Sequence, residues 1–93
     1  MGQGISVYGA DGCHETTRTR EHLQDLGVRH RYINVDEDTV GEMRVRGWNE
    51  GRRRTPTVIV RGDSGTELLC VPSDSELEQA LSRQGFVRRT RTT

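Results

Sequence analysis

The 93-residue sequence contains no lysine, only two prolines and two cysteines, and few aromatic side chains, which make up 4% of the chain. Two cysteines are too few for the disulfide framework of a small secreted domain. Cys13 and Cys70 match no zinc-ligand spacing, so we expect no metal site. No apolar run approaches the roughly 18 residues of a membrane span, and the first residues lack a signal-peptide pattern. We therefore expect a cytoplasmic protein with no membrane partner.

An excess of charge of one sign is also missing. Fourteen basic residues, all of them arginine, balance fourteen acidic residues, and hydrophobic residues make up 30% of the chain. A neutral surface gives no overall field that would hold nucleic acid, so we expect no nucleic-acid partner. The neutral balance also argues against disorder, which requires low hydrophobicity together with high net charge. We expect one small domain with a thin core over 1–87, followed by a flexible arginine-rich tail over 88–93.

Seven segments with alternating strand and helix patterns make up that domain. The expected elements are a strand at 5–8, a helix at 13–26, a strand at 28–36, a helix at 38–48, strands at 57–60 and 67–71, and a helix from 73 to the residue before Gly85. The order β-α-β-α-β-β-α predicts an α/β fold in which three helices cover a four-stranded mixed sheet.

Local signals sharpen four of these elements. Gly27, just after Leu26, is a stop signal for the first helix. Ser73 and Glu76 form the S-x-x-E pattern of a helix capping box. In the second helix, the spacing predicts that Val40 and Met43 face inward, together with Val45 or Gly47. Cys70 lies in a strand, where a lone cysteine is usually a small buried hydrophobe, and we favour that interpretation over a role as a second thiol.

Two features together resemble the glutaredoxin branch of the thioredoxin-like fold over about Ile5 to Phe86. Cys13 lies at a strand-to-helix turn, and Thr55-Pro56 leads into the third strand. Within that branch the chain is most similar to the actinobacterial mycoredoxin type, because Trp48–Val58, W-N-E-G-R-R-R-T-P-T-V, occupies the place of a segment such as N-G-G-N-R-T-V-P-T-V. The absence of lysine is typical of GC-rich coding and fits such a source.

The resemblance implies an activity and a site. It implies thiol-disulfide exchange with a low-molecular-weight thiol, glutathione or mycothiol, as co-substrate, with no bound cofactor, and an unknown protein disulfide as the other partner. Pro56 would be a cis-proline, and the backbone of Thr55 would pair with the cysteinyl part of the thiol. Loop arginines and the polar start of the last helix would hold the carboxylates of the thiol: Arg52, Arg53, Ser73 and Asp74.

The motif itself departs from the family. Cys13-His14-Glu15-Thr16 stands where family members have C-x-x-C or C-G-F-S, so no resolving cysteine is present in the motif. This excludes a dithiol mechanism within the motif and does not match the C-G-F-S type associated with iron-sulfur clusters. The remaining hypothesis is a monothiol cycle on Cys13.

That cycle needs a thiolate, whereas a free cysteine has a pKa of about 8.5. The N–H groups at a helix N-terminus favour an anion, and Thr16 could add a hydroxyl hydrogen bond. We therefore expect Cys13 as the nucleophile and Thr16 as its stabilising partner. The alternatives are an inert thioredoxin-fold interaction or carrier module, in which Cys13 is an ordinary thiol, and, less favoured, a cluster-binding dimer.

Overall fold

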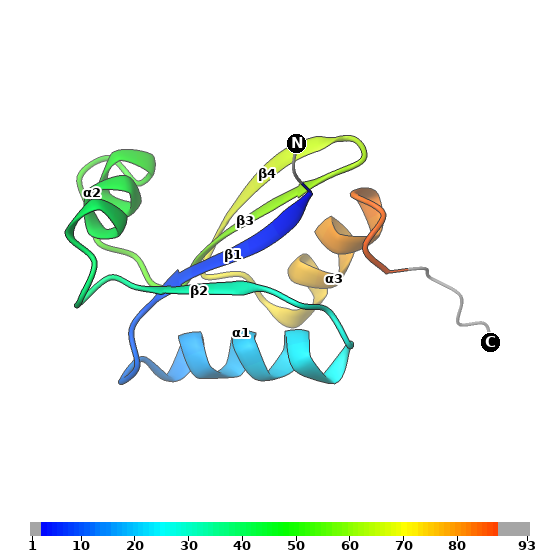
Figure 1. The fold of residues 1–93 in the computed structure, drawn as a ribbon, viewed down its shortest axis with the longest axis horizontal. Helices are drawn as coiled ribbons and strands as arrows, with labels where there is room; N and C mark the ends of the chain where they lie inside the picture. The colour runs from blue at the N-terminus through cyan, green and yellow to red at the C-terminus, as the bar shows by residue number, and fades with distance from the viewer. Residues whose placement is uncertain (1–2, 88–93) are drawn as a thin grey trace.

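The computed structural model describes residues 3–87, and the predicted tail, 88–93, lies outside the described residues. Its elements follow the predicted order β-α-β-α-β-β-α (Figure 1). They are β1 (Gly4–Gly9), α1 (His14–Asp25), β2 (Arg31–Asn34), α2 (Thr39–Trp48), β3 (Thr57–Gly62), β4 (Gly65–Cys70) and α3 (Asp74–Arg83). Within 3–87, no helix is long and apolar enough to cross a membrane.

The four strands form one mixed sheet in the order β2-β1-β3-β4. β1 runs parallel to β2, with Val7 beside Tyr32, and antiparallel to β3, with Val7 beside Val58. β3 and β4 form an antiparallel hairpin, which leaves β4 at the edge. The architecture confirms the predicted α/β class with a four-stranded mixed sheet and three helices.

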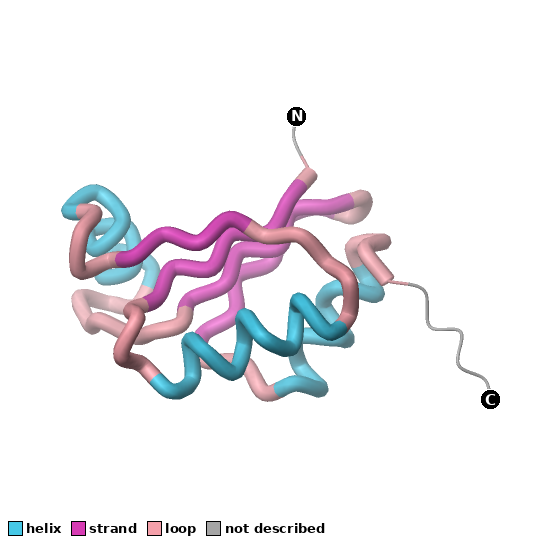
Figure 2. Tube along the Cα trace, turned by 60° about the horizontal axis from the view of Figure 1, so that its bottom comes forward, coloured by secondary structure: helices cyan, strands magenta, loops and turns pink. Residues whose placement is uncertain are grey.

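The helices cover the two faces of the sheet unequally. α1 and α3 lie on one face, whereas α2 lies on the other, over the end of the sheet where β1 finishes (Figures 1 and 2). Side chains alternate between the faces along each strand. The larger core lies under α1 and α3 and consists of Ile5, Val7, Leu23, Val58, Val60, Leu77, Ala80 and Leu81. The smaller core lies under α2 and consists of Tyr8, Val35, Val45 and Ile59.

The predicted inward face of α2 is wrong for Val40 and Met43 but correct at Val45. Val40 and Met43 are 57% and 65% exposed, whereas Gly41 and Val45 are buried. The helix approaches the sheet through Gly41, where a Cβ atom would lie 2.8 Å from Cγ2 of Ile33. A search for apolar spacing overlooks glycine, although its missing side chain is what lets the helix come close.

The sequence signals at the helix ends are confirmed by the structure. Ser73 accepts a hydrogen bond from the N–H of Glu76 at 3.1 Å, and the Glu76 carboxylate accepts one from the N–H of Ser73 at 2.9 Å, which confirms the capping box. α1 ends at Asp25, and Gly27, two residues later, has a φ of 74°, in the left-handed region. The N–H of Val28 then bonds to the carbonyl of Leu23 at 2.9 Å. Val28 is therefore part of a helix stop, and β2 begins later than predicted.

Candidate functional site

Cys13 is the N-cap residue of α1, immediately after the turn that follows β1. Its backbone is extended, with φ −88° and ψ 117°, and its N–H donates to the carbonyl of Ala10 at 3.0 Å. The side chain is half-buried and its thiol is free. The sulfur therefore lies at the positive end of the helix dipole while remaining accessible, which is a suitable position for a nucleophilic thiolate.

Thr55 contacts this sulfur through two different groups. The Thr55 hydroxyl donates to Sγ of Cys13 at 3.4 Å, and the Cys13 thiol donates to the carbonyl oxygen of Thr55 at 3.5 Å. The following peptide bond, Thr55–Pro56, is cis, and the carbonyl of Pro56 accepts from the N–H of Val71 at 2.9 Å. The resemblance to glutaredoxins implied a role only for the backbone of Thr55. Its hydroxyl is an additional functional group, signalled in the sequence by threonine immediately before the proline.

Thr16 lies behind the sulfur, in the first turn of α1. Its side chain is 2% exposed, and Oγ1 accepts from the N–H of Ala10 at 3.3 Å. A Cβ atom added to Gly9 would overlap the Thr16 side chain, so β1 and α1 are packed closely here. The hydroxyl still has its own proton to donate, so Thr16 can fix the turn and also stabilise a thiolate.

The surroundings of Cys13 change its acidity in opposing directions. Burial raises the pKa of the thiol, because it disfavours the charged form. Hydrogen bonds from the side chains of Thr16 and Thr55, and from the N–H groups of Thr16 and Glu15, lower the pKa by more. The net pKa of Cys13 lies below its ordinary value, so the thiolate fraction near neutral pH is increased.

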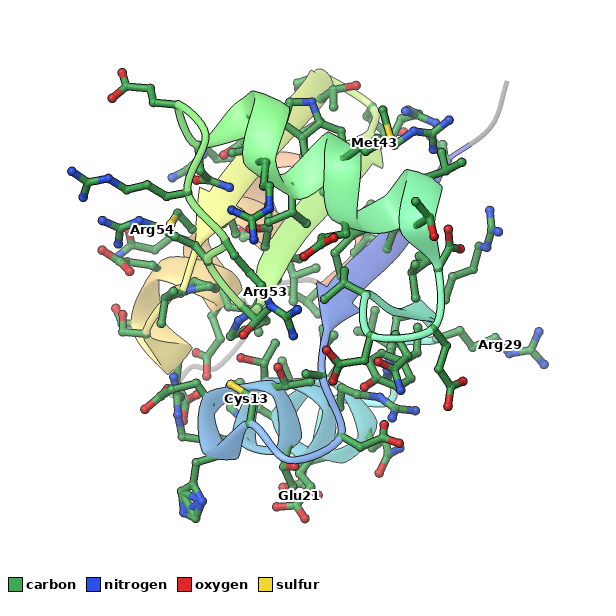
Figure 3. All side chains as sticks on the ribbon, turned by 90° about the vertical axis from the view of Figure 1, so that its left-hand side faces the viewer. Cys13, Glu21, Arg29, Met43, Arg53 and Arg54 are labelled. Atoms are coloured by element: carbon green, nitrogen blue, oxygen red, sulfur yellow. The ribbon has the colours of Figure 1, made fainter. Side chains whose placement is uncertain are left out.

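The loop before Thr55 carries three arginines, and they differ in their contacts. Arg53 bonds to the carboxylates of Asp36 at 2.5 Å and Glu42 at 3.4 Å, which raises the pKa of its guanidinium. Arg52 and Arg54 are exposed, and within 3–87 neither has an ion pair. Figure 3 shows Arg53 and Arg54 on the loop that crosses above Cys13. Arg53 is thus occupied by side chains of the protein, whereas Arg52 is free to contact a ligand.

The two predicted residues at the start of α3 are engaged within the protein. Both the N–H and the hydroxyl of Ser73 belong to the capping box. Asp74 forms an ion pair with Arg18 of α1, and Arg18 also donates to the carbonyl of Pro72 at 2.9 Å. These contacts join the N-terminal end of α3 to the helix that begins at Cys13.

Cys70 lies at the exposed end of β4, beside Thr57 of β3. The prediction that it is buried is wrong. β4 is an edge strand, and its side chains on the face of Cys70 are not covered: Leu68, two residues earlier, is 41% exposed. Cys13 and Cys70 are both free thiols.

An open depression of about 510 Å³ adjoins Cys13 on the side of α1. Asp11, His14, Arg18 and Glu21 are among its lining residues, and Glu21 lies below Cys13 in Figure 3. The hydroxyl of Tyr32 donates to the Asp11 carboxylate at 2.7 Å, which anchors the loop before Cys13. Of the residues described, no three His, Cys, Asp or Glu side chains are grouped so as to hold a metal ion.

Solved structures with the same fold include several thiol-related proteins. The thioredoxin-like protein BC3987 aligns with a TM-score of 0.71 and 24% identity, over 84% of this chain and 94% of its own. A glutaredoxin from Archaeoglobus fulgidus aligns with a TM-score of 0.66 and 22% identity, over 85% of this chain and 86% of its own. At these identities the likeness shows the fold.

A larger protein shares the fold over part of its length. Maleylacetoacetate isomerase from Anaeromyxobacter dehalogenans, solved with bound glutathione, aligns with a TM-score of 0.56 and 21% identity, over 90% of this chain and 40% of its own. No curated protein matches the chain. The glutaredoxin family model matches residues 5–64, which is more than half of the sequence. The chain therefore belongs to the glutaredoxin family.

Proposed function

We propose that this protein is a monothiol thiol-disulfide oxidoreductase of the mycoredoxin-like type, which uses Cys13 alone and a low-molecular-weight thiol in a reducing cytoplasm. Family membership supports a role in thiol-disulfide exchange in general. The observation that carries the monothiol proposal is the position of the Cys13 sulfur. It lies at a helix N-terminus, next to the Thr55 hydroxyl, with a lowered pKa.

The cycle has two exchange steps. In the first, the Cys13 thiolate attacks the small-thiol sulfur of a mixed disulfide, so that a Cys13–small-thiol disulfide forms while the protein-side sulfur leaves as a thiolate and takes up a proton. In the second, another small-thiol thiolate attacks the adduct at the sulfur of the bound small thiol. The products are the small-thiol disulfide and the regenerated Cys13 thiolate. No second cysteine of the protein is needed.

Thr55 links ionisation of Cys13 to substrate binding. In the thiol form, the Thr55 carbonyl accepts the Cys13 proton, whereas the Thr55 hydroxyl donates to the sulfur. Once the proton is lost, the hydroxyl still stabilises the thiolate and the carbonyl oxygen has no donor. That carbonyl can then accept a hydrogen bond from the backbone N–H of an incoming cysteinyl thiol, as the family resemblance implies.

The choice of small thiol depends on the groups around this backbone edge. Arg52 is exposed and unpaired within 3–87, so it can contact a carboxylate of glutathione. Arg53 could do so only by leaving Asp36 and Glu42. The same-fold isomerase was solved with glutathione bound, which supports a thiol of this class. Mycothiol is the other candidate, so the experiment uses both glutathione and mycothiol.

Mass spectrometry of the Cys70→Ser protein tests the proposal. Oxidised glutathione, or mycothiol disulfide, should place one small-thiol adduct on Cys13, and addition of the reduced thiol should release it. The Cys13→Ser/Cys70→Ser protein is the matched control and should stay unmodified. An absence of adduct on Cys13, or an adduct that excess thiol does not release, would support the inert interaction or carrier module instead.

A further inference from the structure

The face of the sheet that carries α2 is only partly covered. α2 packs near the end of β1, and no helix of the described chain lies over the first half of β1 on that face (Figures 1 and 2). A depression of about 470 Å³ opens there, lined by residues of β1, β2 and β3 and of the loop before β2. Cys13 follows the opposite end of β1, so the depression is separate from the thiol site.

The strand register brings two arginines to either side of this depression. Ser6 of β1 pairs with Arg31 of β2, and Gly4 of β1 pairs with Arg61 of β3. Ser6 alternates with Ile5 and Val7, which belong to the core under α1 and α3, so Ser6 and its partner Arg31 lie on the opposite face. Arg61 is two residues after Ile59, which belongs to the core under α2, and so lies on that same face.

The two residues of β1 that lie between the arginines have little or no side chain. Gly4 has no side chain, and a Cβ atom there would meet nothing within 4 Å. Ser6 adds a small side chain with a hydroxyl. β2 and β3 are about 10 Å apart, since each neighbouring pair of strands is separated by about 4.8 Å, and the two arginines are offset by two residues, about 7 Å, along the strands. Their Cα atoms therefore lie about 12 Å apart, a gap that two arginine side chains can span to reach one ligand.

The charge of this site is not neutralised by the protein. Within 3–87, neither Arg31 nor Arg61 takes part in an ion pair, whereas four other arginines do: Arg18, Arg46, Arg53 and Arg83. No acidic residue lines the depression. The Asp63 carboxylate accepts a hydrogen bond from Gln3, which lines the depression, and a Cβ atom built on Gly85 would overlap its other oxygen. Arg29 lies at the rim and extends away from the molecule (Figure 3).

We infer that Arg31 and Arg61, on either side of Gly4 and Ser6, form a binding site for a small phosphorylated molecule. Guanidinium groups bind phosphate oxygens with two parallel hydrogen bonds, and two of them match the charge of about −2 on a phosphate monoester. The Ser6 hydroxyl supplies a further donor. The volume of the depression falls in the range of small-ligand sites, about 300–1,000 Å³. This site is independent of the proposed exchange reaction.

An NMR titration of the full chain tests the site, with sodium pyrophosphate as the probe at constant ionic strength. The amide signals of Gly4, Ser6, Arg31 and Arg61 should shift together and saturate. The Arg31→Gln/Arg61→Gln protein should bind about tenfold or more weakly, whereas Arg44→Gln/Arg54→Gln, which has the same net charge, should bind within about twofold of the wild type. All four are exposed side chains, so both variants should fold.

Three results would overturn the inference. An equal loss of pyrophosphate affinity in the two double variants would mean that binding depends only on the net charge of the protein. Shifts centred on Cys13 and its loop, or no saturable binding up to about 10 mM, would remove the site, since millimolar affinity is already at the weak limit of specific binding. Tighter binding of hexaglutamate than of pyrophosphate by the same residues would identify a site for acidic peptides and not for phosphate.

Discussion

The Thr55 hydroxyl donates to the sulfur of Cys13 at 3.4 Å, while the Thr55 carbonyl accepts from the Cys13 thiol at 3.5 Å. One residue thus stabilises both protonation states of the nucleophile, through different groups. The carbonyl favours the thiol and the hydroxyl favours the thiolate. Substitution of the Thr55 side chain removes only the stabilisation of the thiolate, because the carbonyl that favours the thiol belongs to the backbone.

Thr55→Val should raise the pKa of Cys13 without changing the backbone. The two side chains have similar shapes, and only the hydroxyl donor is lost. The midpoint of the Cys13 alkylation rate against pH should rise by about one unit, because a hydrogen bond to a charged group is worth about 1.5 kcal/mol and one pKa unit about 1.4 kcal/mol. In the wild type the midpoint should fall below the ordinary value of about 8.5. Thr66→Val, on exposed β4, is the control, and an equal shift there would contradict the role of Thr55.

Thr16→Val should affect both stability and acidity. The buried N–H of Ala10 would lose its acceptor, which should lower the free energy of unfolding by about 1–3 kcal/mol in urea denaturation. The pKa of Cys13 should also rise, since the Thr16 side chain lowers it. Thr16→Ser keeps the hydroxyl and should leave the alkylation midpoint near that of the wild type. Equal alkylation midpoints in the serine and valine variants would contradict the role of the Thr16 hydroxyl.

Gly9→Ala should loosen the packing behind the nucleophile. The added methyl group would overlap Thr16, and overpacking of a buried site costs about 1–3 kcal/mol of unfolding free energy. Gly47→Ala is the matched control, because a Cβ atom there meets nothing within 4 Å and lies in α2. It should raise the unfolding free energy by up to about 1 kcal/mol, as alanine is the better helix former. Urea denaturation of both proteins should therefore give shifts of opposite sign.

Tyr32 should ionise at unusually high pH. Burial, followed by its hydrogen bond to Asp11, raises the pKa of Tyr32 to about 12. The neutral phenol therefore stabilises the folded state fully below the unfolded pKa of about 10, and this contribution is lost as pH rises towards 12. Absorbance titration of the phenolate should show a lower Tyr32 pKa in Asp11→Asn than in Asp25→Asn. Equal pKa values of Tyr32 in the two variants would mean that Asp11 does not raise the pKa of Tyr32.

Several parts of the fold could be predicted from the sequence because they depend on local chemistry. Glycine at the end of α1, the Ser73–Glu76 capping box and the apolar strand that begins at Thr57 each identify an element without knowledge of its neighbours. The position of Cys13 at the start of α1 follows from the same kind of signal. The expectation that Pro56 lies near the nucleophile comes instead from the resemblance to the glutaredoxins.

Other parts depend on tertiary contacts that residue spacing does not contain. Gly41 and not Met43 faces the sheet, because close approach favours the smallest residue. Cys70 is exposed because β4 forms the edge of the sheet, which the strand pattern alone does not reveal. Occupation of Arg53 by Asp36 and Glu42 likewise requires the folded arrangement of α2 and the loop.

The most direct test of the central proposal is the rate at which each single-cysteine variant releases glutathione from a glutathionylated peptide, in the presence of reduced glutathione at pH 7. Cys70→Ser should turn over within about twofold of the wild type, because the cycle uses one cysteine, and Cys13→Ser should be inactive. The same rates should be measured with mycothiol and a mycothiol mixed disulfide, because mycothiol is the other candidate thiol. Wild-type rates no higher than those of Cys13→Ser with both thiols would contradict a catalytic role for Cys13.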